Sequence, residues 1–399
     1  MSTRARLRAW LEIMRISNLP TVLSNAIAGA TLGACALAVG RTSQGGGSGI
    51  VVWFGGFVSV AGPDGPRDPL QSLDNMGAVL APLALPLCAY VGGMILNDAF
   101  DAAVDARERP SRPIPSGRIS RRSAFAAGFT LLAAALLLSL ATGLAAVVGA
   151  TALLVLAIIA YDRFHTKSVA STMLLAGCRG LASLIPMLAF AHGDIAVLLR
   201  FGAFTLPLAL AAWTLGLSLL AREEVALRAS GGRSNEDPTP LPCPRCGQLM
   251  VGGHGPCAEC GQPSSAPERR RVVERRTNLR ARLLLLAPTV AVLAMLAAFF
   301  ISQTARSRAA RELGFDDLMH GVPGLAIALG ILLIWLGAKA HEAMRREPAR
   351  TPEAIGMLIA CLALIDAMAL AMGGHWLASL ACTALFLVTR RLQRRIAGS

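Results

Sequence analysis

The sequence predicts an all-α fold, namely a polytopic membrane helical bundle of nine to ten transmembrane helices. Only 16% of the 399 residues are charged, whereas a soluble domain usually carries about a quarter, and 54% are hydrophobic. The apolar residues are concentrated in long uncharged runs, each close to the roughly twenty residues that a helix needs to cross a bilayer. The chain is therefore expected to be an integral membrane protein.

Ten segments have the length and composition of a membrane span. They are residues 19–40, 77–98, 124–142, 144–162, 169–191, 200–221, 282–303, 321–339, 354–372 and 374–390. The last two are separated only by Gly373, Gly374 and His375, so a bundle of nine helices is the alternative.

Basic residues predict the orientation of these spans. The net charge is +14, and the arginines that supply most of it flank the apolar runs, as the positive-inside rule expects. This placement favours a membrane surface over nucleic acid, which we do not expect as a partner. Most arginine-rich connections fall on one side, and only loop 304–320 disagrees. We expect a multi-pass protein of the cytoplasmic (inner) membrane with both termini in the cytoplasm.

Composition also divides the chain into three regions. Residues 1–228 contain the first six spans, and residues 281–399 contain the remaining ones. Between them, residues 229–280 are polar and rich in Ser, Gly, Pro and Arg. We interpret this segment as a cytoplasmic insertion between the two transmembrane halves.

The second predicted span ends in regularly spaced polar residues. Asn97, Asp101 and Asp105 are four residues apart, so a continuous helix would place them on one face. Oxygen ligands of this kind suit Mg²⁺, which binds one or two carboxylates together with substrate phosphates. Arg109 and Arg112 follow at once, and arginine with a metal ion suits a diphosphate. The alternative is an acidic helix end that the neighbouring arginines balance.

The residues that follow strengthen the first interpretation. Residues 107–118 read RERPSRPIPSGR. Together with Asn97, Asp101 and Asp105, they resemble the first aspartate-rich motif of the UbiA-type prenyltransferase family, N-x-x-x-D, then D, then R-P-x-R-P-[IL]-x-x-G. The resemblance implies a UbiA-like membrane enzyme that transfers a prenyl group from a prenyl diphosphate to an aromatic or lipid-like acceptor. It also implies that Asn97, Asp101 and Asp105 are catalytic, with Asp101 and Asp105 as Mg²⁺ ligands, and that Arg109 and Arg112 bind the diphosphate.

The end of the fourth span supplies further candidates. Tyr161 and Lys167 lie in a segment that resembles the Y-x-x-x-[LF]-K segment of the same family, which implies diphosphate binding by both. Lys167 is one of two lysines in the chain; an ordinary positive-inside residue is the alternative for it, and an interfacial aromatic for Tyr161. Asp162 is either a partner in the metal shell or a salt-bridge partner of Arg163.

Arg179 lies about eleven residues into the fifth span, where a charge is costly. A charged residue inside a membrane indicates a functional site, here a contact to the diphosphate or the acceptor. The alternative is a structural pair with another buried acid, for which Asp366 in the ninth span is the candidate.

The sequence departs from the family where a second aspartate-rich motif is expected after span six. Residues 219–225 read LLAREEV, and Glu223 and Glu224 are adjacent, so they cannot share one helix face. This departure resembles the EboC-like subgroup. It keeps open an alternative function, a non-catalytic UbiA-like membrane protein that binds a prenyl lipid and serves a biosynthesis or export complex.

Four of the nine cysteines form two knuckles within residues 243–260. Cys243 and Cys246 form the first C-x-x-C-G knuckle, and Cys257 and Cys260 form the second. Two such pairs provide the four thiolates of a structural zinc ribbon, and a redox dithiol pair is the alternative. The sequence thus predicts structural Zn²⁺ in the cytoplasmic insertion, where the ribbon could cap the active site or dock a protein partner.

Overall fold

The computed structural model describes residues 3–42, 50–53, 56–59, 76–163, 169–232, 241–242, 249–250, 322–346 and 351–395. The chain divides into two compact units. The larger consists of Met1–Leu215 with Thr289–Ser399, and the smaller is Gly216–Pro288. The predicted insertion, residues 229–280, falls within the range of the smaller unit, while its exact boundaries stay a prediction.

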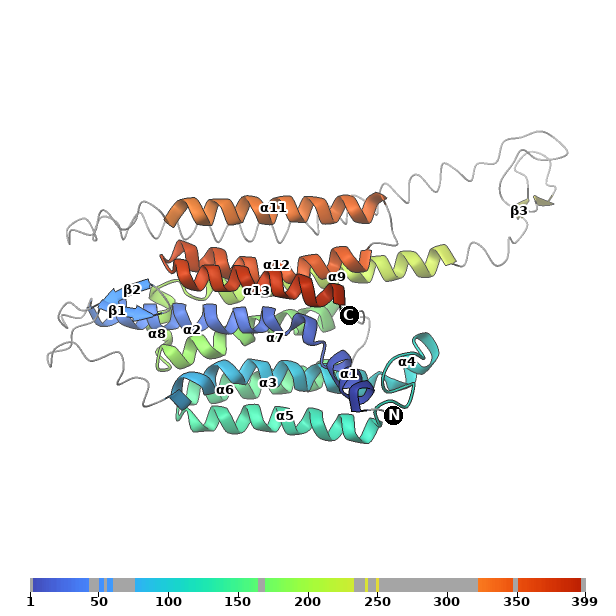
Figure 1. The fold of residues 1–399 in the computed structure, drawn as a ribbon, viewed down its shortest axis with the longest axis horizontal. Coiled ribbons are helices and arrows are strands. Elements are labelled where there is room, and N and C mark those ends of the chain that lie inside the picture. Colours follow the sequence, from blue (N-terminus) through green and yellow to red (C-terminus); the bar gives the residue numbers. More distant parts are fainter. Residues whose placement is uncertain are drawn as a thin grey trace. The chain divides into compact units, whose positions relative to one another are not determined.

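The larger unit is a bundle of long helices (Figure 1). Its N-terminal part contains α1 (Thr3–Ile13), the 3₁₀ turn η1 (Ile16–Asn18), α2 (Leu19–Thr42), and a hairpin in which β1 (Ile50–Trp53) pairs antiparallel with β2 (Gly56–Ser59). It continues with α3 (Met76–Phe100), α4 (Ala102–Glu108), α5 (Arg121–Ala141), α6 (Ala145–Arg163), α7 (Val169–Phe190), α8 (Ile195–Arg200) and α9 (Thr205–Gly232), the last of which runs into the smaller unit. Its C-terminal part contains α11 (Val322–Arg346), α12 (Thr351–Met372) and α13 (Trp376–Arg395).

Seven described helices are long and apolar enough to cross a membrane, which confirms the predicted polytopic bundle. They correspond to the predicted spans at 19–40, 77–98, 124–142, 144–162, 169–191, 321–339 and 354–372. The span predicted at 200–221 corresponds to a shorter apolar helix, Thr205–Ala221, which begins after α8 has ended at Arg200. The span predicted at 282–303 lies outside the described residues.

The last two predicted spans are separate helices. Helix α12 ends at Met372 and α13 begins at Trp376, and the two pack against each other. The turn between them contains Gly374 at φ +84°, a left-handed conformation that glycine adopts without a steric penalty. A single continuous helix across residues 354–390 is therefore excluded.

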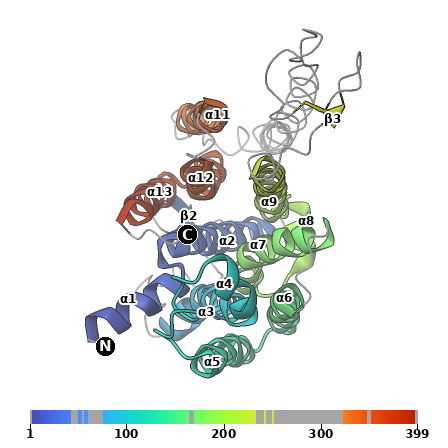
Figure 2. The same cartoon turned by 90° about the vertical axis from the view of Figure 1, so that its right-hand side faces the viewer.

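Helix α2 connects the two halves of the bundle. It packs against α3 and α7 of the N-terminal half and against α12 and α13 of the C-terminal half (Figure 2). Its approach to α7 depends on Gly29 and Gly33, because a Cβ at either position would overlap the carbonyl oxygen of Ser183 or Met187. Small residues four apart are a common device for close helix packing in membranes.

The smaller unit contains one described hairpin, in which β3 (Leu241–Pro242) pairs antiparallel with β4 (Leu249–Met250). The first predicted cysteine knuckle, Cys243 and Cys246, falls between these strands in the sequence. Both of these cysteines, and also Cys257 and Cys260, lie outside the described residues.

Candidate functional site

The candidate site lies at the junction between α3 and α4. The sequence predicted one helix face through Asn97, Asp101 and Asp105, but the regular helix ends at Phe100 and a new one begins at Ala102. The one-turn spacing nevertheless persists in the backbone, because Asp101 N–H donates to Asn97 O and Asp105 N–H donates to Asp101 O, both at 2.9 Å. The interruption brings Asp105 onto a separate short helix.

Side chains of α5 support this interruption. Arg121 Nε donates to the carbonyl oxygen of Ala99 at 2.9 Å, so a carbonyl from the last turn of α3 finds a partner outside the helix. The same guanidinium lies over the Phe125 ring, which meets the ring of Phe100 edge-on at 4.9 Å between centroids. These contacts hold the end of α3 against the start of α5.

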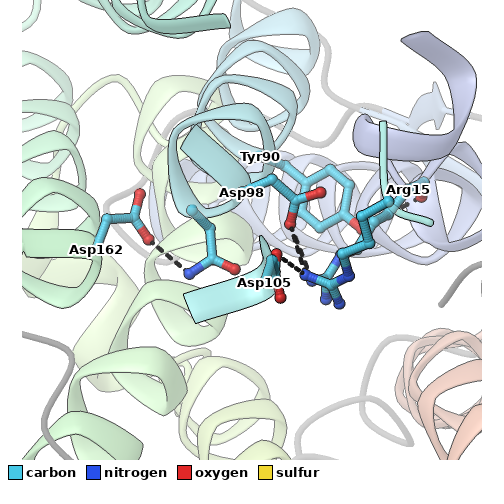
Figure 3. A network of polar contacts seen from close by, with 7 residues as sticks. Arg15, Tyr90, Asp98, Asp105 and Asp162 are labelled. Carbon is cyan, nitrogen blue, oxygen red and sulfur yellow. Dashed lines mark hydrogen bonds and ion pairs between the residues drawn. The ribbon is translucent and has the colours of Figure 1, made fainter. Parts of the chain in front are cut away.

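Arg112 bridges two carboxylates in this site, Asp98 and Asp105, both labelled in Figure 3. Its Nη1 lies 2.7 Å from Asp105 Oδ2 and 3.4 Å from Asp98 Oδ1. The two acids are nearly buried, with exposed fractions of 7% for Asp98 and 5% for Asp105. A buried charge requires a counter-charge, and a charge-assisted hydrogen bond is among the stronger polar contacts in proteins. Arg112 thus connects the end of α3 with α4.

A second arginine, which directly precedes the first span, reaches the same carboxylate. Arg15 Nη2 lies 3.5 Å from Asp98 Oδ1 (Figure 3). The backbone of Arg15 is left-handed, with φ 46° and ψ 50°, which is uncommon for a residue other than glycine and is often found at functional sites. Its carbonyl accepts hydrogen bonds from Asn18 N–H at 2.9 Å and from the Tyr90 hydroxyl at 3.4 Å.

The loop that carries Arg112 is fixed by its own hydrogen bonds. Arg118 pairs with Glu12 of α1 at 2.9 Å and donates to Ser111 O at 2.7 Å. The Ser116 hydroxyl donates to Arg112 O at 2.7 Å. This arginine–proline segment is therefore held against α1 in a defined conformation, so that Arg112 is positioned before any ligand binds.

Helix α6 contributes a further acid. Asn97 Nδ2 donates to Asp162 Oδ1 at 3.4 Å, as Figure 3 shows for the labelled Asp162. Asp162 is 4% exposed, and its Oδ2 has no hydrogen-bond partner among the described residues. The site thus gathers acids from α3, α6 and the α3–α4 segment.

The oxygen atoms of this site fit a magnesium ion. Described residues contain no cluster of three acids already in metal-binding geometry. Mg²⁺ does not need one, because it usually retains water and binds one or two carboxylates with substrate phosphates. Asp98 and Asp105 already share one cation, the Arg112 guanidinium, and the partnerless Asp162 Oδ2 supplies another oxygen nearby. The donor set is therefore suited to a hard cation.

The predicted diphosphate contacts are only partly gathered here. Arg112 lies in the site, whereas Arg109 is exposed at the end of α4. Tyr161 is next to Asp162 on α6. Arg179 instead donates from Nη2 to Thr21 Oγ1 at 2.6 Å, within the bundle. Lys167 lies outside the described residues.

Sequence reasoning missed Asp98 and gave Arg15 no part in the site. The four-residue spacing selects Asn97, Asp101 and Asp105, and it does not select Asp98, which directly follows Asn97. An acid within an apolar span is itself a signal of function, and this criterion selects Asp98. Arg15 was counted only as a positive-inside residue, although it directly precedes the first span. Asp162 lies beside the site through its contact with Asn97, and its role in a metal shell stays a prediction.

The fold and site together define a multi-pass membrane protein with an arginine-bridged acidic site at one end of its bundle. The model of the UbiA prenyltransferase family matches residues 50–234 of this chain.

Several curated relatives are named digeranylgeranylglyceryl phosphate synthase. The protein of Methanopyrus kandleri is 63% identical over 51 residues, which are 12% of this chain and 18% of the relative. That of Methanoregula boonei is 45% identical over 64 residues, which are 16% of this chain and 23% of the relative. That of Ignicoccus hospitalis is 32% identical over 143 residues, which are 36% of this chain and 34% of the relative. The chain thus spans between about a fifth and a third of the length of these relatives.

One solved structure also resembles this chain, and it is described as "Structural and mechanistic insights into the biosynthesis of Digeranylgeranylglyceryl phosphate synthase in membranes". It is 16% identical, with a TM-score of 0.45, and the match covers 97% of this chain and 99% of the other.

Proposed function

We propose that this protein is an integral membrane prenyltransferase that depends on Mg²⁺. It transfers the prenyl group of a prenyl diphosphate to a lipid-like or aromatic acceptor. The observation that carries the proposal is the pair of nearly buried carboxylates, Asp98 and Asp105, joined by the Arg112 guanidinium at the end of the bundle. The UbiA family domain and the relatives named as synthases support it.

Each group of the site has a role in binding the diphosphate. Asp98 and Asp105, with Asp101 and Asn97 beside them, would hold Mg²⁺, and the bound ion would supply the positive charge that stabilises the diphosphate as a leaving group. Arg112 and Arg15 are then free to contact phosphate oxygens, which an arginine binds through two parallel hydrogen bonds. Arg109 and Lys167 border this site in the sequence and complete the predicted diphosphate contacts.

Asp162 compensates in part for the missing second aspartate-rich motif. Glu223 and Glu224 lie on α9, where the family pattern expects two spaced aspartates. Asp162 supplies a carboxylate from α6 instead, next to Asn97 and with one oxygen available. The site therefore does not depend on the sequence after span six for all of its acidic groups.

The acceptor is a lipid alcohol under this proposal. The relatives are named for a glyceryl phosphate that carries two geranylgeranyl groups, and such a product implies transfer to an oxygen of a lipid. The apolar interior of the bundle suits a prenyl tail and keeps water away from the allylic cation formed on departure of the diphosphate. An aromatic acceptor is the alternative within the same reaction class.

The site lies on the cytoplasmic side of the inner membrane. Gln393, near the end of α13, donates from Nε2 to Asn18 Oδ1 at 3.0 Å, so the last helix ends beside the start of the first span. The arginines of both chain ends and of the 107–122 segment therefore gather at one end of the bundle, as the positive-inside rule expects for a cytoplasmic face.

The cysteine knuckles form a structural zinc ribbon in the smaller unit. Zinc would fold this short segment and present it to a protein partner. Metal analysis of the purified chain tests this proposal: one Zn²⁺ per chain is expected, and loss of zinc after replacement of Cys243 and Cys246 by Ser. A chain that purifies without zinc contradicts it.

The experiment for the main proposal is Mg²⁺-dependent release of diphosphate by the purified full chain. Geranyl, farnesyl and geranylgeranyl diphosphates are supplied with a panel of lipid alcohols and aromatic acceptors. Release that requires acceptor and is lost in Asp105→Asn supports the transferase. Asp194→Asn is the matched control, because that aspartate caps α8 through Val197 N–H, away from the site. Tight binding of the diphosphate without release favours the non-catalytic alternative, a lipid-binding member of a biosynthesis or export complex.

A further inference from the structure

The N-terminal helix α1 lies beside the end of the bundle that carries the acidic site. In Figure 1 it runs across the direction of the long helices, and in Figure 2, which looks along those helices, it projects sideways toward the N-terminus. Helix α1 ends at Ile13, and the first membrane span begins at Ile16. A helix that directly precedes a span and lies across it is placed at the level of the bilayer surface.

Side chains on the inner face of α1 hold this helix against the bundle. Ala9 and Ile13 are fully buried in an apolar cluster that they share with residues of α3 and α5. Glu12 pairs with Arg118 at 2.9 Å. Helix α1 is thus a fixed part of the larger unit, and it supports the loop that carries Arg112.

The outer face of α1 combines arginines with an exposed leucine. Arg4, Arg6 and Arg8 are exposed, and Leu7 between them is 60% exposed. Arg4 and Arg8 are one helical turn apart and flank Leu7 on one side, while Arg6 flanks it on the other. Basic residues around an apolar side chain are typical of helices in the membrane interface, where the apolar group enters the acyl boundary and the arginines stay among the headgroups.

The three arginines of this face have no acidic partner within the part of the chain that the structure describes. No described residue forms a hydrogen bond or ion pair with the side chain of Arg4, Arg6 or Arg8, and Glu12 is already paired with Arg118. Positive charges near the start of a helix also oppose its dipole, so these arginines do not stabilise α1 by themselves. An external anion is therefore the partner that this face fits.

We propose that the face of α1 formed by Arg4, Arg6, Leu7 and Arg8 binds anionic lipid headgroups at the bilayer surface. That surface is within reach because α1 leads directly into a membrane span. Arginine binds phosphate oxygens through paired hydrogen bonds, and each basic residue near an anionic surface adds to the attraction. Leu7 adds an apolar contact that only a bilayer offers. This interaction is separate from the transferase reaction and does not depend on it.

The test is hydrogen–deuterium exchange of the α1 amides in the full chain, reconstituted in lipid nanodiscs. The discs contain phosphatidylcholine alone or phosphatidylcholine with about one-third phosphatidylglycerol, which is anionic. Exchange in α1 is expected to be about tenfold slower with the anionic lipid, because binding disfavours opening of the helix. The triple variant Arg4→Gln, Arg6→Gln, Arg8→Gln should lose this difference. Equal exchange of wild-type α1 in both kinds of disc would overturn the proposal.

Three controls separate binding of the bilayer surface from other effects of charge. Replacement of three exposed arginines of α13 by Gln removes the same charge at the same end of the bundle and should leave the difference intact; they are Arg391, Arg394 and Arg395. Replacement of the three α1 arginines by Lys keeps their charge and should also preserve it. Inorganic phosphate added to phosphatidylcholine discs should not slow exchange.

Loss of the difference in the α13 variant would show that net charge alone matters, and protection by phosphate would show that the arginines bind a free anion. Either result, or loss of the difference in the Lys variant, would overturn the proposal. Because amide exchange is measured without substrate, failure of the transferase reaction would leave the outcome unchanged.

Discussion

The bundle holds buried carboxylates in two different ways. At its end, Asp98 and Asp105 share the Arg112 guanidinium, and Arg15 adds a second positive charge. In its interior, Asp366 is held by neutral donors, Ser24 and Asn25, while Arg179 remains at a distance.

The difference separates two kinds of site. Arginines that pair with carboxylates can exchange them for a metal ion and a diphosphate without leaving an unpaired charge. Neutral donors around a fully buried carboxylate offer no such exchange, so that region is suited to joining helices α2 and α12. The predictions below test this contrast, from the largest expected effect to the smallest.

Replacement of Asp105 by Asn should nearly abolish diphosphate release while leaving the fold intact. The amide keeps the shape of the side chain but removes the charge that holds the metal ion, and loss of one such electrostatic contact commonly costs about 100-fold or more in rate. Turnover with saturating Mg²⁺ and the thermal unfolding midpoint in detergent are measured together. A variant with wild-type turnover would remove Asp105 from the mechanism.

Replacement of Asp366 by Leu should act mainly on stability. It leaves the Asn25 amide without its acceptor in the bundle interior, whereas the Ser24 hydroxyl can still donate to Thr21 O, so the expected cost is about 1–3 kcal/mol. Denaturation of the detergent-solubilised chain measures this loss, and the comparison is Ser139→Ala, which removes a buried hydroxyl that bonds only within α5, to Leu136 O. Wild-type stability in Asp366→Leu would show that the two helices are joined without this contact.

Replacement of Arg112 by Lys should lower turnover about tenfold, less than the loss of a carboxylate. Lysine keeps the charge but not the planar group that reaches Asp98 and Asp105 together. Turnover and the KM for the prenyl diphosphate are measured in parallel with Arg122→Lys, which changes an exposed arginine near the start of α5. Equal effects in both variants would mean that charge alone matters at position 112.

Replacement of Glu12 by Gln should have the smallest effect. It weakens the partly exposed pair with Arg118, which is worth about 0.2–1 kcal/mol. Because Arg118 holds the loop that carries Arg112, the KM for the prenyl diphosphate is expected to rise a few-fold at constant kcat. High salt should reduce the difference between variant and wild type, and a salt-independent effect would argue for a different cause.

Local patterns predicted a large part of the fold. The lengths of apolar runs located seven helices that could span a membrane, because the thickness of the bilayer is imposed on each helix separately. The same patterns did not reveal that α3 stops at Phe100, since this depends on contacts with α5 such as that of Arg121 with Ala99 O. The close approach of α2 to α7 at Gly29 and Gly33 likewise emerged only from packing.

The sequence predicted where the candidate site lies, whereas the tertiary structure determined which of its residues pair with one another. The sequence by itself determined that acids and arginines accumulate at the end of the second span, and that Arg179 and Asp366 lie inside the bilayer. Only the tertiary structure decided that Asp98 joins Asp105 on Arg112 and that Asn97 meets Asp162 from another helix. It also decided that Asp366 meets Ser24, a residue 342 positions away. The physical reason is that hydropathy and helical periodicity act over a few residues, whereas the partner of a buried charge depends on which helices pack together.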